Sequence, residues 1–370
     1  MAKGQRVETV IVGGGQAGLV AGYHLGRRGR EFLILEGNER IGDSWRNRWD
    51  SLRLFTPAWV SKLDGWRFPA KSVSFPTKDE MGDYLEAYAE QFGLPFRTGV
   101  RVESVTKNGR GFVVTTADGR YEADNVILAT GAERLPKVPA FASELDKGIR
   151  QMHSADYKGP HQLTDGPVLI VGLGNSGAEI GREVVRTHET YVSGKPSAEL
   201  PFKHGPNMAR FVVPIIRFVG LHVLSMRTPI GRKVRPKFVK LAAPLIRVKT
   251  KDLVAAGAEL VGRTVGVENG MPVLADGRVL DVKNVIWCTG FRGDYSWVDA
   301  PAFDEDGSPR HRRGVASEVP GLYFMGLRFQ FAAASDVFPG VGRDADYVAK
   351  HIAARVKTGS RDQVVSSSGR

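Results

Sequence analysis

The sequence predicts an α/β protein with two Rossmann-like, three-layer domains, the second inserted into the first. One order of elements occurs twice: an apolar strand, a Gly-x-Gly-x-x-Gly turn, a helix and a second strand, starting near residues 7 and 167. This order is typical of a βαβ unit that binds a dinucleotide. Two further apolar strands end in Thr-Gly, at residues 126–131 and 285–290. The second of these indicates that the chain returns to its first domain.

These patterns give the expected domain boundaries. The first domain is predicted over residues 1–157 and 281–370, and the second over residues 158–280. Within the second we expect a basic helical insertion at about residues 203–251. A chain of 370 residues is long enough for such an arrangement.

Composition excludes several classes of protein. With 42% hydrophobic and 25% charged residues, the chain has the composition of a globular protein. It contains neither an apolar run of about 18 residues nor a signal-peptide pattern at its start, so we expect a cytoplasmic location. The one cysteine, Cys288, excludes a Cys-x-x-Cys redox pair, and the histidines have no metal-ligand spacing. We therefore expect no metal.

The positive charge is concentrated in one segment. The net charge is +12, and Lys203–Lys251 contains twelve Lys or Arg and no Asp or Glu. The favoured interpretation is a solvated basic face that attracts an anionic dinucleotide. A membrane-surface face is the second interpretation, and a nucleic-acid site, which we do not expect, is the third.

The first glycine turn has the residue types that a bound pyrophosphate requires. Gly13 permits the tight turn, Gly15 allows the backbone to approach the phosphates, and Gly18 allows close packing of helix on strand. Gln16 and Ala17 begin the helix, whose N-terminus favours negative charge. Glu36 ends the next strand, where its carboxylate can accept both ribose hydroxyls.

The second glycine turn differs from the first at the end of the following strand, the position that contacts the ribose of a dinucleotide. Its predicted binding residues are Gly172, Gly174, Asn175, Ser176 and Gly177. The following strand ends at Ser193 instead of an acid, and Lys195 stands close by. A lysine without a neighbouring acid favours the 2′-phosphate of NADPH, whereas an exposed loop lysine at this position would leave NADH open.

Several segments together resemble the class B flavin-dependent monooxygenases. They are Gly13–Gly18, Glu36, Gly42–Arg46, both Thr-Gly strands and Gly172–Gly177. Met152–Tyr157 resembles the His-x-x-x-Tyr end of the fingerprint of that family, in the form typical of the branch that oxygenates nitrogen and sulfur. The resemblance implies FAD on the first domain and NADPH on the second.

The resemblance also implies a set of binding residues. Those expected at FAD are Gly13, Gly15, Gln16, Ala17, Gly18, Glu36, Ser44, Trp45, Thr56, Val102, Thr130, Gly131, Asp336 and Asp344. Those expected at NADP are Gly172, Gly174, Asn175, Ser176, Gly177, Ser193, Lys195, Thr289 and Gly290. Thr56 and Asp336 are the candidate catalytic residues. The alternatives are that either Asp is a cap or loop residue and that Trp45 belongs to a packed loop.

The function that follows is an NADPH-dependent monooxygenase. It would transfer one oxygen atom from a flavin hydroperoxide to a soft nucleophile, an amine or sulfide of a small substrate. The partners would be that substrate and molecular oxygen. The sequence leaves the oligomeric state open, with a homodimer as one option. The first alternative is a flavin-dependent reductase or dehydrogenase that passes electrons to another acceptor. The second is a non-catalytic dinucleotide-binding or membrane-associated protein.

Overall fold

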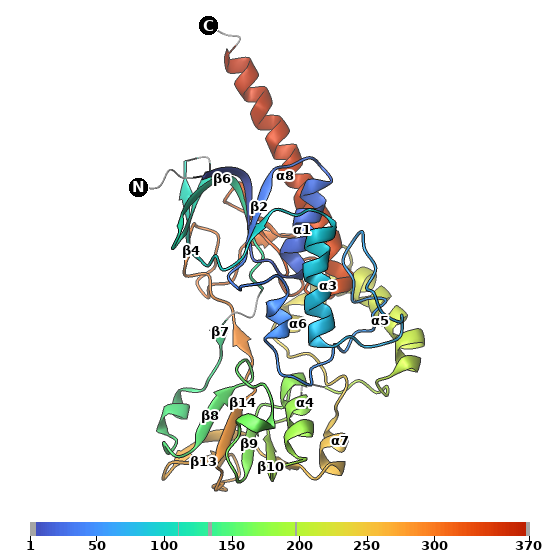
Figure 1. The fold of residues 1–370 in the computed structure, drawn as a ribbon, viewed down its shortest axis with the longest axis vertical. Coiled ribbons are helices and arrows are strands. Elements are labelled where there is room, and N and C mark those ends of the chain that lie inside the picture. The colour runs from blue at the N-terminus through green and yellow to red at the C-terminus, as the bar shows by residue number, and fades with distance from the viewer. Residues whose placement is uncertain (1–4, 110, 132–134, 197, 368–370) are drawn as a thin grey trace.

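The computed structural model describes residues 5–109, 111–131, 135–196 and 198–367, with side chains up to residue 355. Figure 1 shows two α/β units stacked along the long axis of the molecule, each with its own sheet. Both sheets contain adjacent parallel strands joined through helices. The predicted α/β class with two Rossmann-like units is confirmed.

The first unit is built on a ten-stranded sheet. Its parallel part has the order β3-β2-β1-β6-β19, and an antiparallel meander of β4, β5 and β6 extends it. The strands are β1 (Gln5–Val12), β2 (Phe32–Leu35), β3 (Phe96–Arg97), β4 (Val102–Asn108), β5 (Gly111–Thr116), β6 (Gly119–Leu128), β16 (Val298–Asp299), β17 (His311–Arg312), β18 (Val315–Ala316) and β19 (Leu322–Phe324). Strand β1 is buried from Val10 to Val12 because it lies between β2 and β6.

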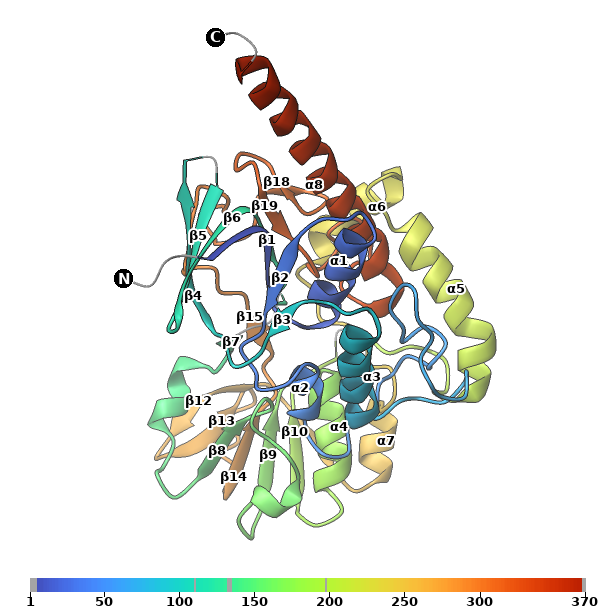
Figure 2. The same ribbon diagram turned by 45° about the horizontal axis from the view of Figure 1, so that its top comes forward.

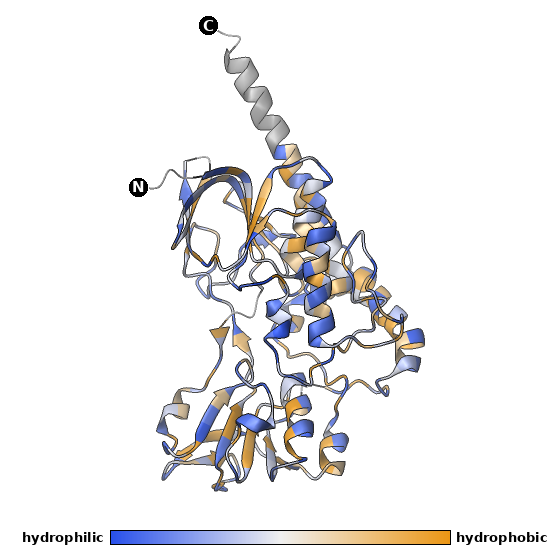
Figure 3. Cartoon of the chain, in the orientation of Figure 1, coloured by the Kyte–Doolittle hydropathy of each residue, from blue (hydrophilic) through white to orange (hydrophobic). Residues whose placement is uncertain are grey.

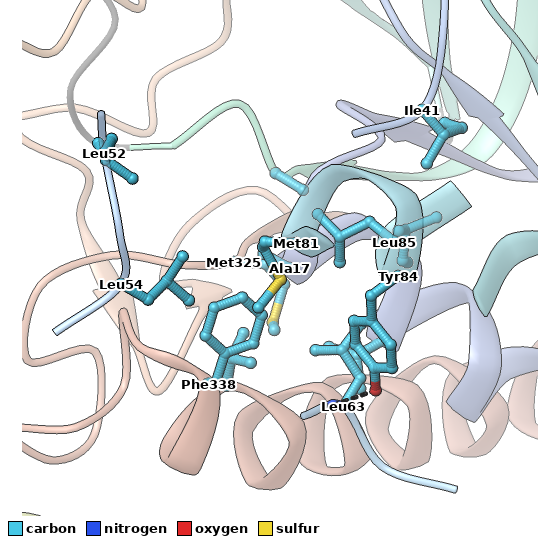
Figure 4. Close-up of a cluster of buried hydrophobic side chains, with 14 of the residues drawn as sticks. Ala17, Ile41, Leu52, Leu54, Leu63, Met81, Tyr84, Leu85, Met325 and Phe338 are labelled. Carbon is cyan, nitrogen blue, oxygen red and sulfur yellow. Dashed lines mark hydrogen bonds between the residues drawn. The ribbon is translucent and has the colours of Figure 1, made fainter. Parts of the chain in front are cut away.

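Helices cover this sheet and hold the loop that follows β2. They are α1 (Gln16–Gly26), α2 (Asp43–Arg46), α3 (Lys78–Gln91) and α8 (Phe338–Ser367), and Figure 2 shows α1 between the sheet and α8. Helix α3 begins at a capping box in which Thr77 and Glu80 bond to each other's backbone N–H. Figure 4 shows part of the core, where the Tyr84 hydroxyl accepts a hydrogen bond from Leu63 N–H.

The second unit is built on a five-stranded parallel sheet of order β11-β10-β9-β14-β8. Its strands are β8 (Arg150–His153), β9 (Val168–Val171), β10 (Thr190–Ser193), β11 (Glu259–Val261) and β14 (Asn284–Trp287). Helices α4 (Asn175–Val184) and α7 (Thr250–Ala255), short helices η1 (Ala140–Glu144) and η2 (Pro160–Gln162), and the hairpin of β12 (Thr264–Glu268) and β13 (Met271–Leu274) complete it.

The crossing between the units lies elsewhere than the sequence indicated. Strands β8 and β14 fall in the ranges expected for the first domain, yet both pair within the five-stranded sheet. The chain crosses at β7 (Leu135–Pro136) and β15 (Phe291–Arg292), which pair with each other between the two sheets in Figure 1. We therefore propose that the second domain spans about residues 137–290. An apolar strand ending in Thr-Gly fits either sheet, so its pattern does not decide between them.

The basic segment forms helices at the outer edge of the molecule. These are η3 (Met208–Val212), α5 (Val213–Phe218) and η4 (Val219–Val223), which follow one another without a break, and α6 (Pro229–Phe238). Figures 1 and 2 both place α5 at the periphery, away from both sheets. Among the described residues, no helix combines the length and the apolar character needed to cross a bilayer.

Candidate functional site

A cavity of about 650 Å³ lies where the two units meet. Its walls include the first glycine turn, the loop from Ser44 to Thr56, the start of α4 and the segment that enters α8. Its volume is in the range of small-molecule and cofactor sites. Four arginines line it, Arg48, Arg53, Arg101 and Arg328, and they favour an anionic ligand.

The first glycine turn is tightly packed except where it faces the cavity. Gly13 has φ +108°, and a Cβ on Gly18 would lie 1.9 Å from the Gly13 carbonyl oxygen. A Cβ on Gly15 would meet no atom of the chain within 4 Å, although Gly15 lines the cavity. Gly15 also precedes α1 without a side-chain cap, so the N–H groups at the start of this helix remain available to an anion.

Glu36 is held rigidly at the end of β2. Its Oε2 accepts a 2.6 Å hydrogen bond from Gly14 N–H, and its Oε1 accepts hydrogen bonds from the backbone and side chain of Asn38. Among the described residues, Oε2 accepts only this one hydrogen bond and retains a second acceptor site, and Glu36 lines the cavity. This geometry fits the predicted ribose contact.

The second glycine turn repeats the first in detail. Gly172 has φ +109°, a Cβ on Gly177 would lie 1.9 Å from the Gly172 carbonyl oxygen, and a Cβ on Gly174 would meet nothing within 4 Å. Helix α4 also starts without a side-chain cap. The Asn175 side chain donates to Pro244 O and accepts from Ile246 N–H, so the end of the basic segment rests on this turn.

The candidate catalytic residues, Thr56 and Asp336, both line the cavity. The Thr56 hydroxyl is 2.7 Å from that of Ser61, which donates to Thr56 O, so Thr56 donates and keeps acceptor capacity. Asp336 precedes α8 and accepts a hydrogen bond from the Gln16 side chain through its backbone oxygen. Trp45 stacks on Phe338 at a ring distance of 6.2 Å.

The structure brings most of the predicted FAD residues together and few of the NADP residues. The cavity is lined by Gly13, Gly15, Gln16, Ala17, Glu36, Ser44, Trp45, Thr56, Val102, Thr130, Gly131, Asp336, Asn175 and Ser176. The predicted residues outside its lining are Gly18, Asp344, Gly172, Gly174, Gly177, Ser193, Lys195, Thr289 and Gly290. The roles of both groups remain predictions.

Three of the residues outside the lining have other surroundings. Asp344 is fully buried in α8, where its Oδ1 lies 3.6 Å from Arg313 Nε and 3.9 Å from Arg343 Nε. The Ser193 hydroxyl donates to Gly262 O and contacts the hydroxyl of Thr264, so it is satisfied inside the second unit. Lys195 is exposed beyond the end of β10.

The sequence analysis did not predict Glu179 or its ion-pair partner Arg247. Glu179 lies one turn into α4 and lines the cavity beside Asn175 and Ser176. Its Oε2 lies 3.4 Å from Arg247 Nη1, which also donates to Arg53 O. Burial raises the pKa of the Glu179 carboxyl to about 7, and Arg247 opposes that shift. Neither residue belongs to a motif, because they meet only through the tertiary fold.

His153 and Tyr157, the ends of the predicted fingerprint, join parts of the second unit. His153 Nδ1 accepts from Ala155 N–H, so its Nε2 donates to Gly290 O at 3.0 Å. Burial lowers the pKa of His153. The buried Tyr157 bonds through its hydroxyl to Glu183 on α4. His153 therefore links the end of β8 to the loop after β14, and Tyr157 links the loop after β8 to α4.

Comparison with known proteins identifies the family to which the sequence is similar. A family model described as pyridine nucleotide-disulphide oxidoreductase matches residues 10–205. An uncharacterized CzcO-like oxidoreductase of Geobacillus kaustophilus (strain HTA426) is 39% identical over 349 residues, which are 94% of this chain and 98% of the relative.

Proteins with named activities are similar at lower identity. The probable indole-3-pyruvate monooxygenase YUCCA3 of Arabidopsis thaliana is 29% identical, with 98% of this chain and 90% of the relative covered. A solved flavin-containing monooxygenase from Stenotrophomonas maltophilia is 29% identical with a TM-score of 0.71, covering 95% of this chain and 99% of that one. These similarities confirm the resemblance that the motifs indicated.

Proposed function

The chain belongs to the pyridine nucleotide-disulphide oxidoreductase family and is a flavin-dependent enzyme that uses FAD and a nicotinamide dinucleotide; from this premise we propose that it is an NADPH-dependent monooxygenase. In the proposed reaction NADPH, a proton, oxygen and a substrate give NADP⁺, water and an oxygenated product. The proposed substrate is a soft nucleophile, an amine or a sulfide. Bound FAD supplies the redox chemistry, as cofactors do in such enzymes.

The observation that carries the proposal is one cavity reached by both glycine units. Gly15 and Asn175 line it from the two sides, and each glycine turn leaves space where a Cβ would point. The uncapped starts of α1 and α4 and the cavity arginines fit the diphosphate groups of two dinucleotides. The residues present therefore fit both cofactors.

The single cysteine excludes the dithiol chemistry that the family name mentions. Burial raises the pKa of the Cys288 thiol to about 12, so it carries almost no thiolate at neutral pH. A dithiol mechanism needs a second cysteine, and the sequence has none. Similarity to enzymes named as monooxygenases supports oxygen transfer in its place.

The side chains of the cavity would bind and orient more than they react. Glu36 would accept the ribose hydroxyls of FAD, and Trp45, stacked on Phe338, would pack beside the flavin. Apolar walls that include Leu52 and Leu54 would limit the entry of water to the reacting atoms. Few catalytic side chains are needed for such chemistry.

The test is product analysis under isotopically labelled oxygen. The FAD-loaded protein is supplied with NADPH, ¹⁸O₂ and a panel of amines and sulfides, and products are identified by mass spectrometry. We expect one labelled oxygen atom in the product and NADPH consumption that matches product formation. NADPH consumed only to give hydrogen peroxide with every substrate would contradict the proposal and favour the reductase alternative.

The preference for NADPH has its own test. Lys195 is exposed beyond β10, and we propose that it binds the 2′-phosphate. In Lys195→Ala, KM for NADPH is expected to rise about tenfold while KM for NADH changes little, because a tenfold change equals about 1.4 kcal/mol, the scale of one such contact. The control is Lys283→Ala, another exposed lysine of this unit. Equal effects on both dinucleotides would refute the role.

A further inference from the structure

The helical run from Met208 to Val223 exposes large apolar side chains to solvent. Phe211 is 70% exposed, Ile215 63% and Phe218 60%, and Ile216 lies beside them. Positions 211, 215 and 218 follow the spacing of one helical face. We call these four residues the outer apolar face. Single exposed hydrophobic residues are common, whereas such a group marks a contact surface.

The opposite side of the same run is already packed. Met208, Ala209 and Leu221 are buried. The indole of Trp59 donates to Ala209 O at 3.1 Å, and Arg343 donates to Leu221 O at 2.7 Å. The run is therefore fixed to the first unit by its inner side. The outer apolar face does not contribute to the core.

Exposed basic residues occur in the same segment as the outer apolar face. Arg210 and Arg217 are exposed within the same run, and α6 adds the exposed Lys233 and Lys237. In the described part of the chain, Arg247 alone of the twelve basic residues of Lys203–Lys251 forms an ion pair. Figure 3 shows hydrophobic and hydrophilic residues side by side along α5. Apolar side chains that alternate with cations along one helical run fit a surface that is apolar inside and anionic outside.

We propose that the outer apolar face docks the protein on the surface of an anionic lipid bilayer. Phe211, Ile215 and Phe218 would insert at the boundary of headgroups and acyl chains, where buried apolar area stabilises binding. Arg210 and Arg217 would lie at the depth of the lipid phosphates, which attract basic residues near the surface. This inference does not depend on which substrate the enzyme oxidises.

The same charges argue against other occupants. A second copy on the outer apolar face would bring Arg210 and Arg217 against identical arginines, which repel. A nucleic acid would use the cations but give no partner to Phe211 and Ile215, since phosphate contacts dominate such binding. The solvated basic face favoured from the sequence does not account for exposed phenylalanines.

The test is co-sedimentation of the full-length protein with vesicles. Vesicles of equimolar phosphatidylglycerol and phosphatidylcholine are compared with vesicles of phosphatidylcholine alone. We expect binding to the anionic vesicles that weakens as salt is added. The double variant Phe211→Ser/Phe218→Ser is expected to bind about tenfold more weakly. Arg210→Gln/Arg217→Gln is expected to lose most of the preference for anionic lipid.

The control removes the same kind of exposed side chain elsewhere. Val265→Ser/Val279→Ser changes two exposed valines of the second unit and is expected to bind like the parent protein. NADPH oxidation should be unchanged in the phenylalanine variant, which shows that it is folded. Equal binding to both kinds of vesicle, or equal binding of parent and phenylalanine variant, would overturn the proposal. Two other results would also overturn it. In both, neither protein binds vesicles, and the parent protein forms a dimer or binds duplex DNA whereas the phenylalanine variant does not.

Discussion

At the scale of single residues, the two glycine turns allow the two proposed cofactor sites to be tested one at a time. Gly15 and Gly174 both have φ values that alanine tolerates, and an added Cβ meets nothing in the chain. Gly15→Ala should therefore fold but obstruct FAD, while Gly174→Ala should keep FAD and raise KM for NADPH about tenfold or more. Flavin absorbance and steady-state kinetics measure both. Gly266→Ala, also in open space, is the control, and a fully yellow Gly15→Ala protein would contradict the assignment.

Glu179 gives a prediction in pH. Its pKa rises from 4.5 to about 7, so between these values the folded protein holds a proton that the unfolded chain has released. The contribution of this carboxyl to the free energy of unfolding is largest below pH 4.5 and is lost as the pH rises through about 7. Glu179→Gln imitates the protonated form. The variant should therefore be more stable than the parent above pH 7 by roughly 3 kcal/mol, and no more stable at low pH.

The measurement is urea unfolding of both proteins across this pH range. Glu268→Gln changes an exposed carboxyl of β12 and is the control, since it should leave the difference flat. A constant stability difference for Glu179→Gln at all pH values would contradict the raised pKa.

The amino-acid sequence predicted the residues at and beside the cavity that belong to a local motif, and it missed those that only the tertiary fold brings together. Gly13, Gly18 and Glu36 are tied to a local turn whose backbone angles and close approaches demand particular residue types. Glu179 and Arg247 are far apart in the sequence and meet only after the basic segment folds onto α4. No local spacing rule contains such a pair.

At the scale of elements, α3 shows how a local signal stabilises the cavity. Its capping box joins Thr77 and Glu80, and Arg46 of α2 bonds to Asp83 and Glu86 of α3. Thr77→Ala should lower the free energy of unfolding by about 1 kcal/mol, because the N–H of Glu80 loses its acceptor. Thr77→Ser keeps the acceptor and should restore most of that loss in urea unfolding. A destabilised Thr77→Ser protein would show that packing of the methyl group matters instead.

The two Thr-Gly strands show which property of a strand the sequence does not predict: the sheet to which the strand belongs. Residues 126–128 end β6 in the first sheet, and β14 ends just before the second Thr-Gly in the other sheet. Residues 126–128 and all of β14 are buried, so hydropathy predicts each as part of a central strand and cannot assign its neighbours. Register depends on pairing between distant segments, such as Asn284 with Val168. The two strand–turn–helix–strand units and the two Thr-Gly strands could be predicted, but their division between the sheets could not.

At the scale of the whole molecule, the largest cluster of buried hydrophobic side chains spans both units. A continuous cluster of buried side chains contains Ile11 and Ile127 of the first sheet together with Ile170 and Ile286 of the second. The loop after α2 strengthens this junction, because Asp50 N–H donates to Lys158 O beside the buried Trp49. Two covalent crossings, at β7 and β15, also pair with each other. The units are thus coupled by packing as well as by the chain.

This shared core predicts that the molecule unfolds as one body. Domains joined by small polar interfaces unfold separately, whereas a continuous apolar core makes the loss of one unit expose the buried face of the other. Scanning calorimetry of the FAD-loaded protein should therefore give a single transition in which both units unfold together. Trp49→Ala removes a buried side chain beside the junction. It should lower the free energy of unfolding by about 3–5 kcal/mol and so lower the transition temperature. Two separated transitions in the parent protein would show that the cavity lies between units that are free to move, and the cofactors would then have to supply the coupling.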